Sequence, residues 1–209
     1  MPQPASTFNN VLAGTGTTTV SGAQATITGG NTSYIGDWHG TGTLAVADTS
    51  TSSNTNLGTG GVDIAAGGIA NVHTTGPFSF DNALTGSGTL NASTGGQAFS
   101  FGSGAGADFA GTVVLTSNSF MLSGSNTIAL THGTLEISNG NVTIVGDGDQ
   151  NIGGLMINGG SMQFNAMAPD QTMATSRVSA GNLDVSHSGT VRINQPIPFI
   201  PSPPDTPIF

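Results

Sequence analysis

The chain has 209 residues, including 33 glycines and no cysteine, so no disulfide can stabilise it. Two arginines and no lysine stand against 11 acidic residues, a formal net charge of −9 that excludes the cation clusters required by nucleic acids and anionic membrane surfaces. No apolar run approaches the ~18 residues of a membrane-spanning helix. We therefore expect no nucleic-acid partner and no membrane insertion by this chain.

Short segments of alternating apolar and polar residues follow one another along the chain, a period of two that is typical of β-strands. The expected inward-facing pairs are Leu44/Val46, Val62/Ile64, Phe78/Phe80, Phe99/Phe101, Val113/Leu115, Phe120/Leu122, Ile128/Leu130, Leu135/Ile137, Val142/Ile144, Leu155/Ile157, Met162/Phe164, Leu183/Val185 and Val191/Ile193. The residues between them, expected to point outward, include Asp63, Ser79, Ser100, Glu136, Thr143, Gln163, Asp184 and Arg192. Because helix formers such as Lys and Glu are nearly absent, the chain is predicted to be all-β.

The centres of these strands recur at nearly equal intervals. One series consists of Val114, Glu136 and Met156. A second series consists of Met121, Thr143, Gln163 and Asp184, with almost the same step. The step is roughly 20 residues, which is the length of one coil in a repeat protein. Three short strands in each such coil indicate a parallel β-helix, a solenoid whose coils stack at the ~4.8 Å strand spacing of a sheet.

A short phrase repeats at about twice this interval. Residues 40–44 read GTGTL and residues 86–90 read GSGTL, and the Gly-Thr-aliphatic core returns at residues 133–135 and 189–191. The first two steps between these cores correspond to two coils each, while the last step is longer and predicts a long loop, for which residues 166–172 are the candidate. A β-sandwich or barrel would also contain frequent turns, but the repeated phrase favours the solenoid.

The proline content divides the chain into two parts. Residues 1–194 are predicted to form one β-helical repeat domain. Residues 195–209 are rich in proline, which cannot donate to a β-ladder, so they are predicted to form a flexible tail.

Residues 147–151 (DGDQN) supply the first three oxygen ligands of a calcium loop. Ile152 stands where such a loop needs glycine, and Asn158 stands where it needs a bidentate glutamate. The segment is therefore predicted to be a turn between coils, and no metal ligand is expected in the chain.

The four histidines are His39, His73, His132 and His187, and no two lie within four residues of each other, so the ligand pair typical of a helical zinc site is missing. His132 and His187 precede the Gly-Thr cores and are expected in turns. Asp184, Ser186 and His187 are close in sequence, but alternation along a strand predicts that they do not form a catalytic triad.

One cluster combines aromatic and polar residues, and it comprises Tyr34, Asp37, Trp38 and His39. It fits either sugar stacking or core packing, and core packing is favoured. A pair of acids for glycoside or pectin chemistry would have to come from Asp63, Asp81 or Asp108 on neighbouring coils. Nothing in the sequence singles out such a pair, so we predict no catalytic residue, no cofactor and no enzymatic activity.

Three phrases carry a resemblance to a known family: FDNALTGSGTL (80–90), FAGTVVLTSNSFMLSGSNTIALTHGTLEIS (109–138) and VGDGDQNIGGLMINGGSMQFN (145–165). They resemble the passenger region of bacterial type V autotransporters. The resemblance implies a right-handed parallel β-helix displayed at the surface or outer membrane of a Gram-negative bacterium, or outside it. The signal peptide and membrane barrel of that family are not seen, so the resemblance implies a fragment.

The expected function is that of a non-catalytic structural or adhesive β-helix, with self-association or host and bacterial surface ligands as partners. The alternative is a polysaccharide-active β-helix enzyme, a lyase or glycoside hydrolase. Acids clustered on one face of successive coils would favour the enzyme, whereas a continuous Thr/Ser/Asn ladder would favour adhesion. The N-terminal coil, residues 11–27, contains no Pro, Lys or Glu to protect its strand edges, which predicts self-association.

Overall fold

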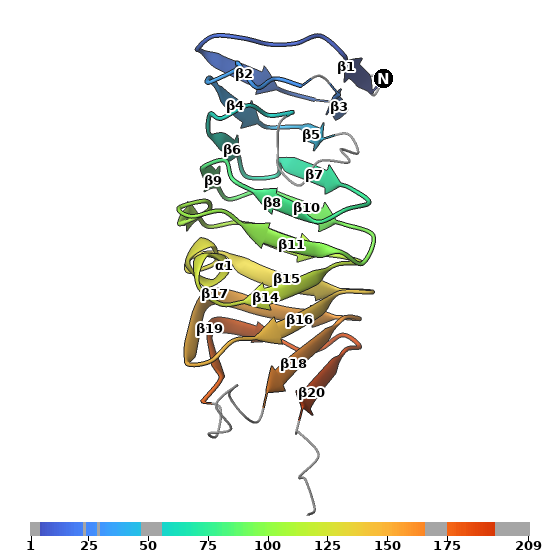
Figure 1. The fold of residues 1–209 in the computed structure, drawn as a ribbon, viewed down its shortest axis with the longest axis vertical. Coiled ribbons are helices and arrows are strands. Elements are labelled where there is room, and N and C mark those ends of the chain that lie inside the picture. The colour runs from blue at the N-terminus through green and yellow to red at the C-terminus, as the bar shows by residue number, and fades with distance from the viewer. Residues whose placement is uncertain (1–4, 23, 29, 47–55, 166–174, 195–209) are drawn as a thin grey trace, which may run out of the picture.

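A computed structural model describes residues 5–22, 24–28, 30–46, 56–165 and 175–194. Every pair of neighbouring strands within its three sheets is parallel, and the chain winds from sheet to sheet as a stack of coils. Figure 1 shows the stack with its N-terminal coils at one end and β20 at the other. The predicted parallel β-helix is therefore confirmed. The proposed loop at residues 166–172 and the proline-rich tail at 195–209 lie outside the described residues.

The longest sheet has nine strands and runs the length of the stack. Its strands are β1 (Ser6–Phe8), β3 (Gln24–Ile27), β5 (Thr43–Val46), β7 (Ile69–His73), β10 (Thr89–Ser93), β13 (Thr112–Leu115), β15 (Thr134–Ser138), β17 (Asp149–Asn158) and β19 (Arg177–Asp184).

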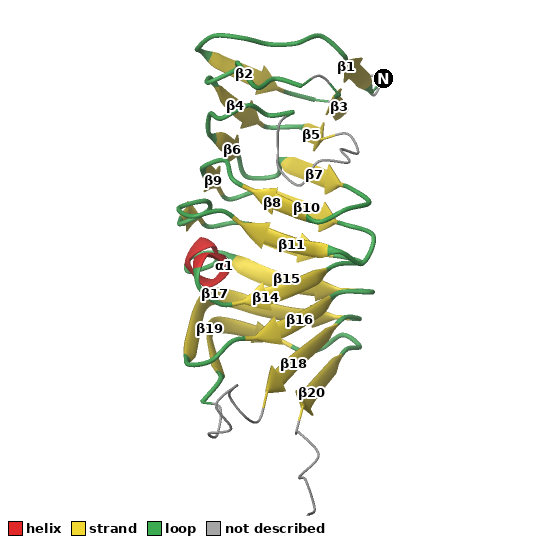
Figure 2. Cartoon of the chain, in the orientation of Figure 1, coloured by secondary structure: helices red, strands yellow, loops and turns green. Residues whose placement is uncertain are grey.

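Two shorter sheets and one short helix complete the coils. The six-stranded sheet contains β8 (Phe78–Phe80), β11 (Ala98–Phe101), β14 (Ser119–Leu122), β16 (Val142–Val145), β18 (Ser161–Asn165) and β20 (Thr190–Asn194). The five-stranded sheet contains β2 (Thr17–Val20), β4 (Asp37–Gly40), β6 (Val62–Ile64), β9 (Leu84–Gly86) and β12 (Asp108–Phe109). The helix α1 (Ser125–Ala129) is drawn in red in Figure 2, beside the strands of the middle coils.

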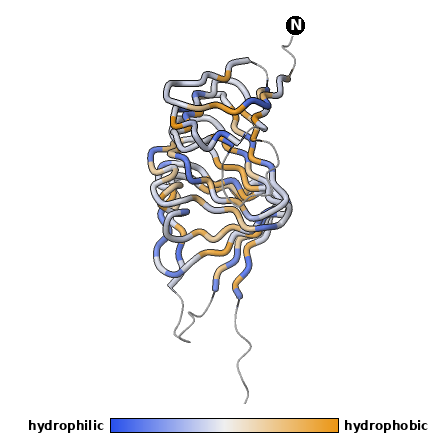
Figure 3. The backbone as a smooth tube through the Cα atoms, turned by 45° about the horizontal axis from the view of Figure 1, so that its top comes forward, coloured by the Kyte–Doolittle hydropathy of each residue, from blue (hydrophilic) through white to orange (hydrophobic). Residues whose placement is uncertain are grey.

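Stacked phenylalanines form the centre of the core. Phe99 packs parallel to Phe78 at a centroid distance of 6.3 Å, and it also contacts Phe120 at 6.3 Å and Phe101 at 5.2 Å. The tube in Figure 3 is orange along stretches that lie above one another in successive coils. Parallel strands in register place each apolar residue on the apolar residue of the coil before, so the core is continuous along the stack.

Buried asparagines stabilise the corners of the coils. Asn118 Nδ2 donates to the carbonyl of Ala92 at 3.1 Å, and Asn141 Nδ2 donates to the carbonyl of Asn118 at 3.2 Å. Asn31 and Asn56 likewise bond to backbone carbonyls one coil away. Each side-chain amide thus satisfies a backbone group that would otherwise be buried without a partner at the turn.

The predicted register is confirmed in the nine-stranded sheet. Val114 pairs with Glu136, and Glu136 pairs with Met156, as their spacing predicts. Leu135 and Ile137 are fully buried while Glu136 is half-buried, in agreement with alternation. Met156 pairs with Asp184, so this last coil is longer than the two coils before it.

The first three copies of the repeated phrase are two coils apart, but the fourth is not. Thr43 pairs with Ile69 and Ile69 with Thr89, so the first two copies lie two strands apart in the same sheet. The third copy, at Thr134, follows by two further strands. The fourth copy does not belong to this series, and its predicted place was wrong, because Thr190 lies in the six-stranded sheet.

The second spacing series was wrong by one residue. Met121 pairs with Ile144 rather than with Thr143, and Asp184 belongs to the nine-stranded sheet. In β16 the predicted faces are therefore exchanged, because Thr143 and Val145 are fully buried. Thr143 can point inward because its hydroxyl donates to Asn141 Oδ1 at 2.7 Å, which satisfies the buried polar group.

Three other predicted pairs differ from the structure. Ile128 and Leu130 do not form a strand: Ile128 is in α1 with 55% of its surface exposed, and Leu130 is the residue at which the helix ends. A period of two over so few residues does not distinguish a strand from a helical turn. The apolar residues of the last coil lie on β20 and at the end of β19, but they are exposed because no described coil covers them: Leu183, Val185, Val191 and Ile193.

Candidate functional site

The outward face of the nine-stranded sheet carries columns of like polar residues. Thr89, Thr112 and Thr134 occupy one column on three successive strands. In the next column Asn91 Nδ2 donates to Asn71 Oδ1 at 2.8 Å. All five side chains are half-buried and alternate with core residues. These five residues form a short Thr/Asn ladder, and Ile69 and Val114 occupy the next positions in its two columns, so it is not continuous along the sheet.

The column of Asn71 and Asn91 passes through Val114 to an acidic position on β15. Glu136 Oε1 accepts hydrogen bonds of 2.9 Å from Ser138 Oγ and from Asn158 Nδ2 on the next strand. The two neutral donors fix the orientation of this carboxylate at the surface of the sheet. The face therefore presents amides, hydroxyls and the Glu136 carboxylate, together with apolar side chains such as Val114 and Met156.

A second polar column crosses the five-stranded sheet. Register places Thr19, His39, Asp63, Thr85 and Asp108 one above another on β2, β4, β6, β9 and β12. His39 Nδ1 lies 2.6 Å from Asp63 Oδ2, and Thr85 Oγ1 donates to Asp63 Oδ1 at 3.2 Å. The His39 and Asp63 side chains are 39% and 40% exposed, so solvent reaches both.

The three acids considered for sugar chemistry are only partly brought together. Asp63 and Asp108 share this column with one strand between them, which places their backbones about 10 Å apart, two strand spacings. Asp81 follows β8 and instead accepts a 2.6 Å hydrogen bond from Ser79 Oγ. The His39–Asp63 pair was missed from sequence, although its separation along the chain is close to one coil.

The aromatic cluster belongs to the core. Trp38 is 1% exposed and Tyr34 is 4% exposed, and their rings meet edge to face at a centroid distance of 5.5 Å. Trp38 Nε1 donates to the carbonyl of Leu57 at 2.8 Å, and Tyr34 Oη lies 2.9 Å from Thr18 Oγ1. Neither ring offers a free face for a sugar, and core packing is confirmed.

Only residues 147–148 of the calcium-loop segment lie in the predicted turn, because residues 149–151 already belong to β17. Arg177 donates to both carboxylate oxygens of Asp149 at 3.0 Å. The carbonyl of Asp147 accepts a 2.8 Å hydrogen bond from Gln150 Nε2. Within the described residues, no group of three or more His, Asp or Glu side chains converges as a metal site would require. The expectation that the chain binds no metal or cofactor stays a prediction.

Asp184, Ser186 and His187 meet in the exposed segment after β19. Ser186 Oγ donates to Asp184 Oδ1 at 2.6 Å and lies 3.2 Å from His187 Nδ1. The bond from the Ser186 hydroxyl, aided by its backbone N–H, lowers the pKa of Asp184. The order is Asp–Ser–His, so the acid orients the serine rather than the histidine, and the relay of a triad is not assembled.

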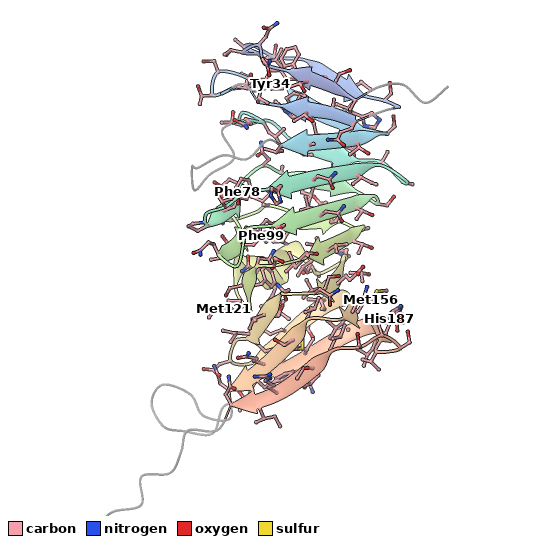
Figure 4. The ribbon with its side chains drawn as sticks, turned by 90° about the vertical axis from the view of Figure 1, so that its right-hand side faces the viewer. Tyr34, Phe78, Phe99, Met121, Met156 and His187 are labelled. Atoms are coloured by element: carbon pink, nitrogen blue, oxygen red, sulfur yellow. The ribbon has the colours of Figure 1, made fainter. Side chains whose placement is uncertain are left out.

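The two remaining histidines lie in a turn and at the end of a strand. His132 lies in the turn before β15, as expected, with Nδ1 3.0 Å from the carbonyl of Ala107. His73 is exposed at the end of β7. Figure 4 shows His187 near Met156 at one edge of the lower coils and Met121 toward the other.

The chain is similar to two much longer proteins of Escherichia coli (strain K12). It is 35% identical to the uncharacterized lipoprotein YdeK over 150 residues, which is 69% of this chain and 11% of that protein. It is 31% identical to the uncharacterized protein YuaQ over 185 residues, which is 88% of this chain and 13% of that protein. The chain thus spans a small part of the length of either relative.

Family models and solved structures add no further relative. No family model matches the chain. No solved structure matches it either. In the described residues, none of the helices is long and apolar enough to cross a membrane.

Proposed function

We propose that the chain is a non-catalytic β-helix that acts in adhesion and self-association through the outward face of its nine-stranded sheet. The observation that carries the proposal is the Thr/Asn ladder formed by Thr89, Thr112, Thr134, Asn71 and Asn91. Hydroxyls and amides at a regular spacing can exchange hydrogen bonds with a similar face. Each bond contributes little, so many in register are needed, and a solenoid supplies that repetition.

The place of action that we propose is the bacterial cell envelope, at the cell surface or outer membrane. Two features support it: the similarity to a lipoprotein and the sequence resemblance to autotransporter passengers. Both relatives are far longer than this chain, so the face proposed here would be one stretch of a longer surface in such proteins.

Bead clustering tests the proposal. Polystyrene beads coated with the chain are expected to cluster, and the double variant Asn91→Glu/Thr112→Glu is expected to abolish clustering, because it adds like charges to the ladder of a chain already at −9. The matched control is Ser79→Glu/Ser100→Glu, which adds the same charge to half-buried outward positions of the six-stranded sheet. Equal clustering by both variants, or none by the unaltered chain, would contradict the proposal.

A polysaccharide-active enzyme is the second candidate, and one observation favours it. The column of the five-stranded sheet combines Asp63, partnered by His39 and Thr85, with Asp108 two strands away. Two carboxylates several ångströms apart are the groups that glycoside hydrolysis requires. Saturable turnover of a polysaccharide that is lost in Asp63→Asn but kept in Asp81→Asn would establish this function instead.

A further inference from the structure

The two ends of the solenoid are complementary. In the described residues, β1 and β2 have a partner strand on one side only, and the same holds for β19 and β20 at the other end. Figure 1 shows these two pairs at opposite ends of the stack. An unpaired strand edge exposes a row of backbone donors and acceptors that can pair with another strand.

The N-terminal end is hollow and uncharged. A cavity of about 480 Å³ opens there, and its walls combine Phe8, Leu12, Val20, Ala25, Ile27 and Trp38 with an equal number of Ser, Thr and Gln side chains. Ser6 also lines it, as the outermost member of an inward-facing column. Residues 5–28 contain no charged side chain. No charged side chain at this end would oppose an apolar surface placed against it.

The C-terminal end projects apolar side chains. Leu183, Val191 and Ile193 continue the inward columns of the core, yet they are 59%, 59% and 68% exposed. Both arginines of the chain lie in this last coil, whereas nearly all the acids lie elsewhere. The end is therefore apolar at its centre and does not share the strong negative charge of the rest of the chain.

We infer that the C-terminal coil of one copy docks on the N-terminal cavity of a second copy, so that the solenoid continues from chain to chain. Translation along the stack presents β1 of the second copy parallel to β19 of the first, in the same sheet. The inward column then runs from Leu155 to Leu183 and on to Ser6 of the second copy. A second copy is the occupant that matches the strand direction and, in the nine-stranded sheet that β1 and β19 both edge, the inward column.

Such a contact joins two different surfaces, so it leaves one free end on each side and builds filaments. It is separate from the lateral contact proposed above, because it uses the ends of the solenoid and not the Thr/Asn ladder. A chain whose ladder is disabled could therefore still form filaments. The proposed function and this inference can thus fail independently: the ladder variant tests the first, and the end variants test the second.

Two end variants test the inference by complementation. Val191→Glu/Ile193→Glu places charge on the projecting end, and Ser6→Glu places charge at the rim of the cavity; all three positions are exposed, so folding is retained. Sedimentation velocity is expected to show concentration-dependent growth of the unaltered chain. In the background of the ladder variant Asn91→Glu/Thr112→Glu, where the lateral contact is removed, each end variant alone is expected to associate on the order of 100-fold more weakly, because docking would bury an unpaired charge.

Sedimentation of a mixture of the two variants gives the decisive result. Made in the ladder variant Asn91→Glu/Thr112→Glu, which removes the lateral contact, each end variant keeps one intact end, so an equal mixture is expected to form one-to-one dimers and to stop there. The ladder variant Asn91→Glu/Thr112→Glu is expected to assemble end to end like the unaltered chain. The inference is overturned if the unaltered chain stays monomeric at high concentration. It is also overturned if the end variants grow normally or if their mixture forms no dimer.

Discussion

Replacing Phe99 with alanine tests the stacked core most directly. Phe99 is 1% exposed and contacts three other rings, so the change empties the centre of the stack. Loss of roughly 120 Å² of buried apolar surface at about 25 cal/mol per Å² amounts to ~3 kcal/mol. The lost ring contacts and the residual cavity add ~1 kcal/mol or more. We expect the free energy of unfolding to fall by about 4 kcal/mol.

Urea unfolding followed by circular dichroism measures this loss. Phe99→Leu should cost roughly 1–2 kcal/mol, because leucine fills most of the space. The neighbouring control Ser100→Ala lies on the outward face and should change stability by less than about 0.5 kcal/mol. Each coil contacts only its neighbours, so a cavity in the middle should also broaden the transition as the two halves uncouple. A loss below about 1 kcal/mol for Phe99→Ala, or equal losses at both positions, would refute this account of the core.

Two further predictions concern the faces of β15 and the segment after β19. Leu135→Asp should be severely destabilising in urea because it buries an unpaired charge, whereas Glu136→Gln should be nearly silent; comparable losses would contradict the register. The Asp184 pKa is lowered, so its hydrogen bonds stabilise the folded chain above the ordinary carboxyl pKa, and this contribution is lost as pH falls through the lowered value. An NMR titration should therefore show the pKa of Asp184 rising toward its ordinary value in Ser186→Ala, and an unchanged titration would exclude this cause.

Sequence reasoning succeeded where one coil repeats the pattern of the next. The spacing of Val114, Glu136 and Met156 predicted their pairing because the coils between them are nearly equal in length. The same reasoning failed for Met121, whose partner is Ile144, because one added residue in a strand series moves every side chain to the other face. Spacing alone could not detect that shift.

The polar positions were harder to predict than the apolar ones. Thr143 was assigned outward as a polar residue, but a hydroxyl can be buried when a neighbour accepts its hydrogen bond, and Asn141 does so here. The His39–Asp63 contact joins two residues that are one coil apart, so neither residue indicates its partner in the sequence. Such contacts follow from the stacking register, which has to be known to within one residue.

Stacking also determines what kind of function each surface can support. A face that binds through many weak hydrogen bonds needs the same residue on successive coils, as at Thr89, Thr112 and Thr134. Catalysis needs only one well-placed pair of acids, such as Asp63 and Asp108, and gains nothing from repetition. The two proposed functions therefore predict different results for the same variant. Asp63→Asn leaves the ladder intact and should not alter bead clustering, whereas it should abolish hydrolysis if the chain is an enzyme.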